Sequence, residues 1–203
     1  LNESAITAAL HAAQAKGRVA MIYVETPANP TNAMVNFAAI NTAADACATR
    51  GGIRPITVCD NTLLGPIFQR PLEHDIDLVV YSLTKYIGGH SDLVAGSVVG
   101  RKDLVSKVHS IRNAIGSQLD PHSSWMIGRS LETLSLRMNR AAESGRTVAR
   151  WLSTNRHCPV KVFHPEHIPD EDYQELYHQQ CSGPGSTFAF ELPLGRAQSF
   201  AFI

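Results

Sequence analysis

A lysine among hydroxyl and glycine residues is the first candidate for chemistry. Lys85 lies in the segment Tyr81-Ser-Leu-Thr-Lys-Tyr-Ile-Gly-Gly-His-Ser-Asp92, directly after an apolar run. Only the neutral amine of a lysine attacks an aldehyde, and a partly closed site favours loss of the proton. A lysine after a strand is usually a solvated side chain. Here the hydroxyls of Ser82 and Thr84 are suited to hold phosphate oxygens, so we predict that Lys85 forms a Schiff base with a phosphate-bearing aldehyde.

A carboxylate at the end of another apolar run is the second candidate. Asp60 ends the run 55–60, and burial of its charge would be costly without a cation or hydrogen-bond donor. A protonated pyridine nitrogen would be such a partner, and the carboxylate would then keep the ring an effective electron sink. A turn or helix cap at Asp60-Asn61-Thr62 explains the pattern equally well. We predict Asp60 and Thr62 as cofactor contacts.

An asparagine between two prolines is the third candidate. Asn29 lies in Glu25-Thr-Pro-Ala-Asn-Pro30, where the prolines stiffen the loop, so its amide can donate to a ring hydroxyl with little loss of entropy. Asparagine before proline is also an ordinary turn signal. His90 and Asp92 resemble a catalytic dyad, although capping or a structural role is the favoured interpretation.

The elements that must position these residues follow from the apolar pattern. Apolar runs over 19–25, 55–60 and 77–82 each end directly before a polar cluster. Apolar strands buried on both faces predict a parallel sheet covered by helices. Ligands of such sheets bind beyond the carboxyl ends of the strands. The three clusters are therefore expected at one edge of the sheet.

The rest of the chain predicts further helices and strands. One long helix is expected over 121–152, with Asp120 as its cap and Pro121 as its first residue, and a helix of this length often bridges two lobes. The other expected elements are helices over 35–48, 102–112 and 170–180 and strands over 95–100, 160–163 and 186–192.

Composition limits the possible partners. The 203 residues are 44% hydrophobic and 18% charged, with a formal net charge of zero. This profile indicates a packed globular protein and argues against a nucleic-acid or acidic-lipid surface. We find no apolar run of about 18 residues that would span a membrane and no signal-peptide pattern at the start. We therefore expect a cytoplasmic protein whose partners are small molecules and other proteins.

Cysteine and histidine spacing predicts no metal site. The histidines lack the i, i+4 spacing of metal ligands. The cysteines show no C-x-x-C pair and indicate ordinary thiols of a reducing compartment; they are Cys47, Cys59, Cys158 and Cys181. The chain lacks an initiator methionine and stops eleven residues after the expected strand at 186–192, so we expect a fragment of a longer protein.

Three ordered motifs carry a resemblance to a known family. They are 81–92, Glu25-Thr-Pro-Ala-Asn-Pro-Thr31 and Cys59-Asp-Asn-Thr62, and they are followed by similar segments at 119–121, 128–138 and 183–192. Together they resemble the cysteine/methionine-metabolism family of pyridoxal-phosphate enzymes, which includes methionine γ-lyase, cystathionine γ- and β-lyase and cystathionine γ-synthase.

The resemblance implies a fold, a cofactor and residue roles. The fold is α/β of the fold-type-I aminotransferase-like kind, with a mostly parallel sheet between helices. Residues 1–136 would belong to the large cofactor domain and residues 137–203 to the start of a smaller C-terminal α/β domain. Lys85 would be the Schiff-base lysine and proton carrier, and Asp60 the pyridine-nitrogen carboxylate. Phosphate contacts fall on Ser82 and Thr84, and the ring-hydroxyl contact on Asn29.

The implied activity is cleavage of a carbon–sulfur bond. A methionine γ-lyase or cystathionine γ-lyase would release a thiol, ammonia and a 2-oxo acid from a sulfur amino acid. The alternative is cystathionine γ-synthase, which replaces the γ-substituent of an acylated homoserine with cysteine. The family implies a homo-oligomer, a dimer of dimers, with active sites completed across the dimer interface.

Some family features are not found in this sequence. A phosphate-binding glycine loop, a ring-stacking tyrosine and a partner-reaching tyrosine and arginine are not found before Glu25, and an arginine for the substrate carboxylate is not found near the end. A non-catalytic module is therefore a further alternative. A nicotinamide-binding domain is disfavoured because no G-x-G-x-x-G follows the first strand.

Overall fold

A four-stranded sheet forms the centre of the computed structural model, which describes residues 3–49, 52–155 and 160–202. Its strand order is β1-β2-β3-β4, where β1, β2 and β3 are parallel and β4 is antiparallel to β3. The bounds are Met21–Glu25, Ile56–Asp60, Leu78–Ser82 and Gly96–Gly100. The predicted α/β class with a mostly parallel sheet is thus confirmed, and the antiparallel β4 is one element that the apolar pattern did not orient.

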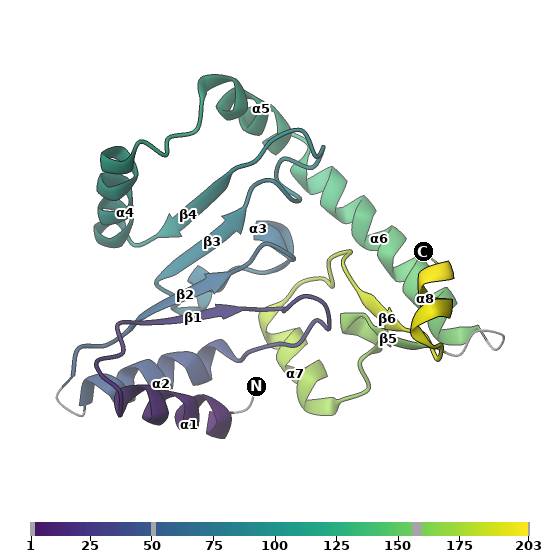
Figure 1. Cartoon of the computed structure of the whole chain (residues 1–203), viewed down its shortest axis with the longest axis horizontal. Coiled ribbons are helices and arrows are strands. Elements are labelled where there is room, and N and C mark those ends of the chain that lie inside the picture. The colour runs from purple at the N-terminus through teal and green to yellow at the C-terminus, as the bar shows by residue number, and fades with distance from the viewer. Residues whose placement is uncertain (1–2, 50–51, 156–159, 203) are drawn as a thin grey trace.

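Helices cover the two faces of this sheet unequally (Figure 1). Helices α1 (Glu3–Gln14) and α2 (Phe37–Thr49) lie along β1 and β2, where Ile22 and Val24 pack against a buried cluster that includes Phe37. Helix α4 (Lys102–Ile115) packs on the opposite face through Leu104. Short helices α3 (Gly65–Phe68) and η1 (Pro71–His74) follow β2. Helix α1 was not predicted.

The expectation that the strands are buried on both faces is wrong for β1. Its side chains alternate between exposed and half-buried, and Met21 and Tyr23 are 49% and 54% exposed. The physical reason is that β1 is an edge strand, while α4 on the opposite face packs against side chains of β2, β3 and β4. Among the described residues, no helix covers the face of β1 that carries Tyr23.

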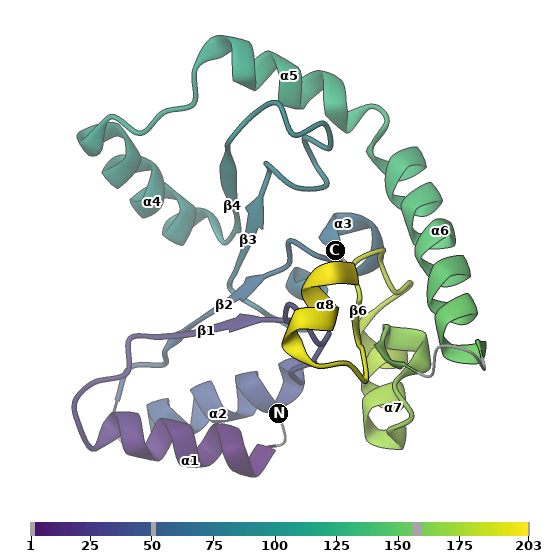
Figure 2. The same ribbon diagram turned by 45° about the vertical axis from the view of Figure 1, so that its right-hand side comes forward.

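The single long helix predicted over 121–152 is two helices. Asp120 caps α5 (Pro121–Leu131) by accepting from the Ser123 amide at 2.9 Å, as predicted. The helix then ends, and α6 (Leu134–Thr154) leaves in a different direction (Figure 2). Thr133 has non-helical angles, and the Ser130 carbonyl accepts from the Thr133 hydroxyl and from Arg137. The two helices are separated by side-chain hydrogen bonds and not by a proline or glycine, so the sequence gives no sign of the break.

The buried carboxylate of Asp77 forms two ion pairs with partly exposed arginines at the base of the sheet. This carboxylate is 7% exposed and accepts from Arg54 at 2.8 Å and Arg101 at 3.0 Å, as well as from the Thr57 amide at 2.9 Å. The amide and the two guanidinium groups outweigh burial and lower the pKa of Asp77. Because a buried charge is stable only when paired and hydrogen-bonded, this cluster joins β2, β3 and the start of α4.

The C-terminal part packs closely on the part before it. It contains β5 (Lys161–Phe163), η2 (Pro165–His167), α7 (Glu171–Gln180), β6 (Ala189–Glu191) and the unpredicted α8 (Arg196–Phe202). Strands β5 and β6 form an antiparallel pair. Helix α6 contributes Met138 to a core with Phe68 and Ile87, and Leu152 to a core with Val162. The division at 136/137 remains a prediction, because α6 belongs to both cores.

A buried histidine in this part predicts acid sensitivity. His164 is fully buried, accepts from the Glu166 amide at 3.2 Å through Nδ1 and packs edge-on against Phe188. Burial lowers its pKa to about 4. Because the unfolded chain then takes up the proton more readily than the folded chain, this stabilisation is complete above the unfolded value of about 6.5 and is lost as pH falls towards 4. The loss amounts to about 3 kcal/mol.

Urea unfolding between pH 7.5 and pH 4 measures this effect. His164→Asn keeps an acceptor for the Glu166 amide but removes the titration, so its free energy of unfolding should fall less steeply than that of the wild type across this window. His178 is exposed at the end of α7, and His178→Asn should follow the wild-type curve. Parallel curves for all three proteins would contradict the assignment to His164.

Candidate functional site

One cavity brings all six predicted site residues together. It has a volume of about 1230 Å³ and lies at the carboxyl ends of the parallel strands. Asp60 ends β2, Ser82 ends β3, and Asn29 lies in the loop after β1. The predicted residues that line the cavity are Asn29, Asp60, Thr62, Ser82, Thr84 and Lys85. Parallel strands present their carboxyl ends at the same edge, which explains this convergence.

The Asp60 carboxylate is held from two sides. Its Oδ1 accepts from the Thr62 amide at 3.0 Å, and its Oδ2 accepts from the Tyr23 hydroxyl at 3.2 Å. Burial and the Asp60 charge raise the pKa of Tyr23, so the phenol keeps its proton and donates it. A carboxylate has about four acceptor positions, so Asp60 can accept a further donor from the cavity. Asp60 can therefore cap the turn after β2 and accept from a ligand at the same time.

The three hydroxyls differ in what they can donate. The Thr62 hydroxyl accepts from the Ser82 amide at 2.8 Å, which leaves its own proton for the cavity. The Ser82 hydroxyl has no partner among the described residues. The Thr84 hydroxyl accepts from the Ala95 amide at 3.0 Å and donates to the Ala95 carbonyl at 3.3 Å. Ser82 and Thr62 are thus freer to bind a phosphate oxygen than Thr84.

Lys85 lies in a compact loop after β3. The Gly88 amide donates to the Leu83 carbonyl and the Gly89 amide to the Lys85 carbonyl, both at 2.7 Å. The Lys85 side chain is exposed, and its amino group has no hydrogen bond or ion pair within residues 3–49, 52–155 and 160–202. The loop therefore presents an uncommitted amine to the cavity.

Asn29 is positioned by its loop rather than by its side chain. The backbone N–H of Asn29 donates to Glu25 Oε1 at 3.3 Å, and the side-chain amide has no partner in the described part of the chain. The peptide bonds before Pro27 and Pro30 are cis. Asn32 fastens the loop by donating to the carbonyls of Phe163 and Thr187, at 2.7 and 3.0 Å.

Three residues of the site were not predicted. Tyr23 holds Asp60, Arg137 contacts the Lys85 loop, and Thr187 lines the cavity and contacts the Tyr86 hydroxyl. Side chains alternate along β1, so Tyr23 and Glu25 lie on one face, and this alternation could have predicted Tyr23 as a site residue. Arg137 and Thr187 lie in segments that support the family resemblance, but their spacing does not connect them to Lys85.

The other candidate chemistries find little support. His90 Nδ1 contacts the Gly88 carbonyl at 2.7 Å, and no hydrogen bond joins His90 to Asp92 in the part of the chain that the structure describes. Burial raises the pKa of Cys59 and Cys181 to about 12, which keeps both thiols protonated. Cys158 lies outside the described residues. Within the described ranges, no group of His, Cys, Asp and Glu could hold a metal ion, and no helix is long and apolar enough to cross a membrane.

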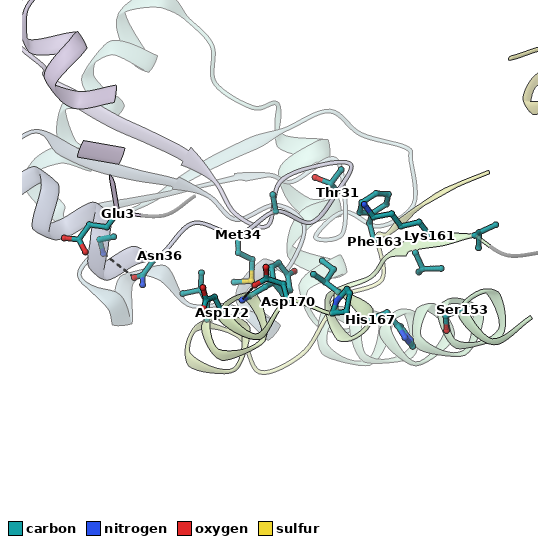
Figure 3. A pocket seen from close by; sticks show the side chains of 18 residues that line it. Glu3, Thr31, Met34, Asn36, Ser153, Lys161, Phe163, His167, Asp170 and Asp172 are labelled. Carbon is teal, nitrogen blue, oxygen red and sulfur yellow. Dashed lines mark hydrogen bonds between the residues drawn. The ribbon is translucent and has the colours of Figure 1, made fainter. Parts of the chain in front are cut away.

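A second cavity of about 1130 Å³ lies away from this site (Figure 3). Glu3 and Asn36 lie at one end of it, and Phe163 and Lys161 lie at the other. It contains none of the six predicted residues. The cavity around Lys85 is therefore the candidate active site.

The Lys85 site fits an aldehyde cofactor that bears a phosphate and a pyridine ring. An uncommitted amine, two available hydroxyl groups and a carboxylate with spare acceptor positions surround one cavity. Together with a mostly parallel sheet, they are the features expected of a pyridoxal-phosphate protein of fold type I.

Comparison with known proteins agrees with this class. The family model described as "Cys/Met metabolism PLP-dependent enzyme" matches residues 2–203, so the chain belongs to this family. The chain is 38% identical over 185 residues to L-methionine gamma-lyase of Pseudomonas deceptionensis, an alignment that covers 90% of this chain and 45% of that protein. The resemblance and the cofactor inferred from the motifs are confirmed.

Two solved structures show the same fold. Cystathionine gamma-lyase from Lactobacillus plantarum, complexed with L-serine, has a TM-score of 0.78 and 35% identity and covers 89% of this chain and 46% of that chain. Cystathionine gamma synthase from Xanthomonas oryzae pv. oryzae, in complex with cystathionine, has a TM-score of 0.82 and 31% identity, with 96% and 48% covered. The chain thus spans about half the length of the relatives it matches.

Proposed function

We propose that this chain carries the cofactor-binding lysine of a pyridoxal-phosphate-dependent carbon–sulfur lyase acting on a sulfur amino acid, of the methionine γ-lyase or cystathionine γ-lyase kind. The observation that carries the proposal is the uncommitted amine of Lys85, which lines one cavity with the Asp60 carboxylate and the Ser82 hydroxyl. The 38% identity to a methionine gamma-lyase and the 35% identity to a cystathionine gamma-lyase support the reaction class.

Each site residue has a proposed task. When bound, pyridoxal phosphate withdraws electrons from the substrate Cα. Lys85 Nζ holds the cofactor and later takes the proton from the substrate Cα. The Asp60 carboxylate accepts from the protonated pyridine nitrogen. The side-chain amide of Asn29 donates to the ring hydroxyl. The phosphate oxygens accept from the hydroxyls of Thr62 and Ser82, and from that of Thr84 once it no longer donates to the Ala95 carbonyl.

The charge of the cavity supports completion of the site by residues from elsewhere. Among the described residues that line it, the cationic side chains are Lys85 and Arg137, and Arg137 donates to four oxygen atoms of this chain. A phosphate dianion is bound best by guanidinium groups or clustered backbone amides. We therefore propose a homo-oligomer, a dimer of dimers, in which neighbouring subunits complete each active site. A cytoplasmic location stays a prediction.

Product analysis tests the reaction. The full-length protein is incubated with methionine, with cystathionine and with an acylated homoserine plus cysteine. The proposal expects a thiol, ammonia and a 2-oxo acid from methionine or cystathionine. The similarity to cystathionine gamma synthase in complex with cystathionine supports γ-replacement as a second candidate reaction. That reaction would produce cystathionine from the mixture of acylated homoserine and cysteine. No turnover of any substrate would exclude both.

A further inference from the structure

Arg137 on α6 contacts the chain directly after Lys85. Its Nη1 donates to the Tyr86 carbonyl at 2.7 Å, and its Nη2 donates to the Ile87 carbonyl at 3.0 Å. Hydrogen bonds from a charged donor are among the stronger ones in proteins. The two residues that follow Lys85 are thus fixed by one guanidinium group.

The guanidinium itself is held in place from the other side. Its Nη2 also donates to the Ser130 carbonyl at 2.8 Å, and its Nε donates to the Thr133 hydroxyl at 3.0 Å. These contacts lie at the turn between α5 and α6, where Leu134 and Met138 are buried in the core. Arg137 therefore connects the Lys85 loop to a rigid part of the fold.

The loop lies directly against this side chain. Gly89 has a φ of +76°, a conformation that favours glycine. A methyl group at Gly89 would overlap Arg137 Nη1. The Arg137 guanidinium therefore lies so close to the backbone of Gly89 that no side chain fits between them.

Arg137 is poorly suited to bind a substrate carboxylate, although it lines the cavity. A guanidinium has five N–H donors, and four hydrogen bonds to protein oxygens are already present. A bidentate contact with a carboxylate needs two free donors. The contacts of Arg137 therefore favour a role through the Lys85 loop.

We propose that Arg137 is the positioning residue of Lys85: it fixes the backbone of Tyr86 and Ile87 so that the lysine amine faces the cofactor site. The inference rests on the proposed function and deepens it. A lysine that must hold the cofactor and then move a proton needs a fixed backbone, because misplacement by about 1 Å can cost about 100-fold in rate.

Three variants of the full-length protein test this role. Arg137→Met removes all four hydrogen bonds at similar volume, whereas Arg137→Lys keeps the charge but cannot donate to three carbonyls and a hydroxyl at once. Arg140→Met is the matched control, because Arg140 is 80% exposed three residues further along α6. Hydrogen exchange of the Gly88 and Gly89 amides is measured without cofactor. In both Arg137 variants we expect about 10-fold to 100-fold faster exchange, and in the control no change.

Cofactor capture and turnover complete the test. Borohydride trapping of pyridoxal phosphate on Lys85 should slow in both Arg137 variants, and kcat should fall about 100-fold with less than about a threefold change in KM. A lowered melting temperature with unchanged exchange, trapping and kcat would overturn the inference, as would full rescue by Arg137→Lys. If the wild type turns over none of the substrates, the proposed reaction fails, while exchange and trapping still decide whether Arg137 positions Lys85.

Discussion

Replacing Lys85 with alanine is expected to abolish the covalent capture of pyridoxal phosphate and to lower turnover by about 10⁴-fold or more. The amine is the group that would bind the cofactor and move the substrate proton, and it has no other partner in the described part of the chain. The Lys85→Ala protein should therefore fold normally but carry no cofactor that borohydride fixes covalently to residue 85. The measurement is the yellow absorbance of the purified full-length protein, before and after borohydride, followed by mass spectrometry of the lysine peptide.

Lys102 provides the matched control. It is an exposed lysine at the first position of α4, at the opposite end of the β3–β4 pair from the Lys85 loop. Lys102→Ala should keep the absorbance band, the trapped peptide and the activity. An equal amount of cofactor fixed covalently by borohydride in Lys85→Ala would refute the assignment of Lys85.

The convergence of the site could be predicted because it depends on local pattern. Each apolar run ends at the same residue as its strand and begins one or two positions before it. Parallel strands that neighbour one another must then bring Asn29, Asp60 and Lys85 to one edge. Residue type and strand direction are enough for this step, and neither requires knowledge of long-range contacts.

The contacts that fix the site could not be predicted in the same way. Arg137 contacts the Tyr86 carbonyl across 51 residues, and a backbone carbonyl leaves no mark in the sequence. The same arginine shares the Ser130 carbonyl with Thr133 at the break between α5 and α6. The helical period continues through this break, so a pattern of apolar residues predicts one helix where there are two.

The role of Thr84 shows a second limit. Its residue type suits a phosphate contact, but its hydroxyl faces Ala95 on the segment that leads back into β4. This pairing depends on the antiparallel return of β4, which the apolar pattern does not specify. The donor capacity of a hydroxyl is thus set by a neighbour whose position comes from the topology.

Asp60→Asn should lower kcat by about 10²-fold to 10³-fold, the range seen when one electrostatic contact to a developing charge is removed. Asparagine has nearly the same size and can still accept from the Thr62 amide, so the turn after β2 should persist. It carries no negative charge, however, and would hold a proton on the pyridine nitrogen much less firmly. The cofactor would then be a weaker electron sink, although Lys85 could still capture it.

This separation of capture from turnover makes the prediction specific. In Asp60→Asn, borohydride should still trap pyridoxal phosphate on Lys85 while kcat falls, whereas Lys85→Ala should lose both. Tyr23→Phe is the matched control, because it removes the 3.2 Å hydrogen bond to Asp60 Oδ2 but keeps the carboxylate. We expect its kcat to fall less than about fivefold, since the lost contact is one neutral donor at an exposed side chain. An Asp60→Asn protein with more than half the wild-type kcat would show that the carboxylate charge does not act on the cofactor.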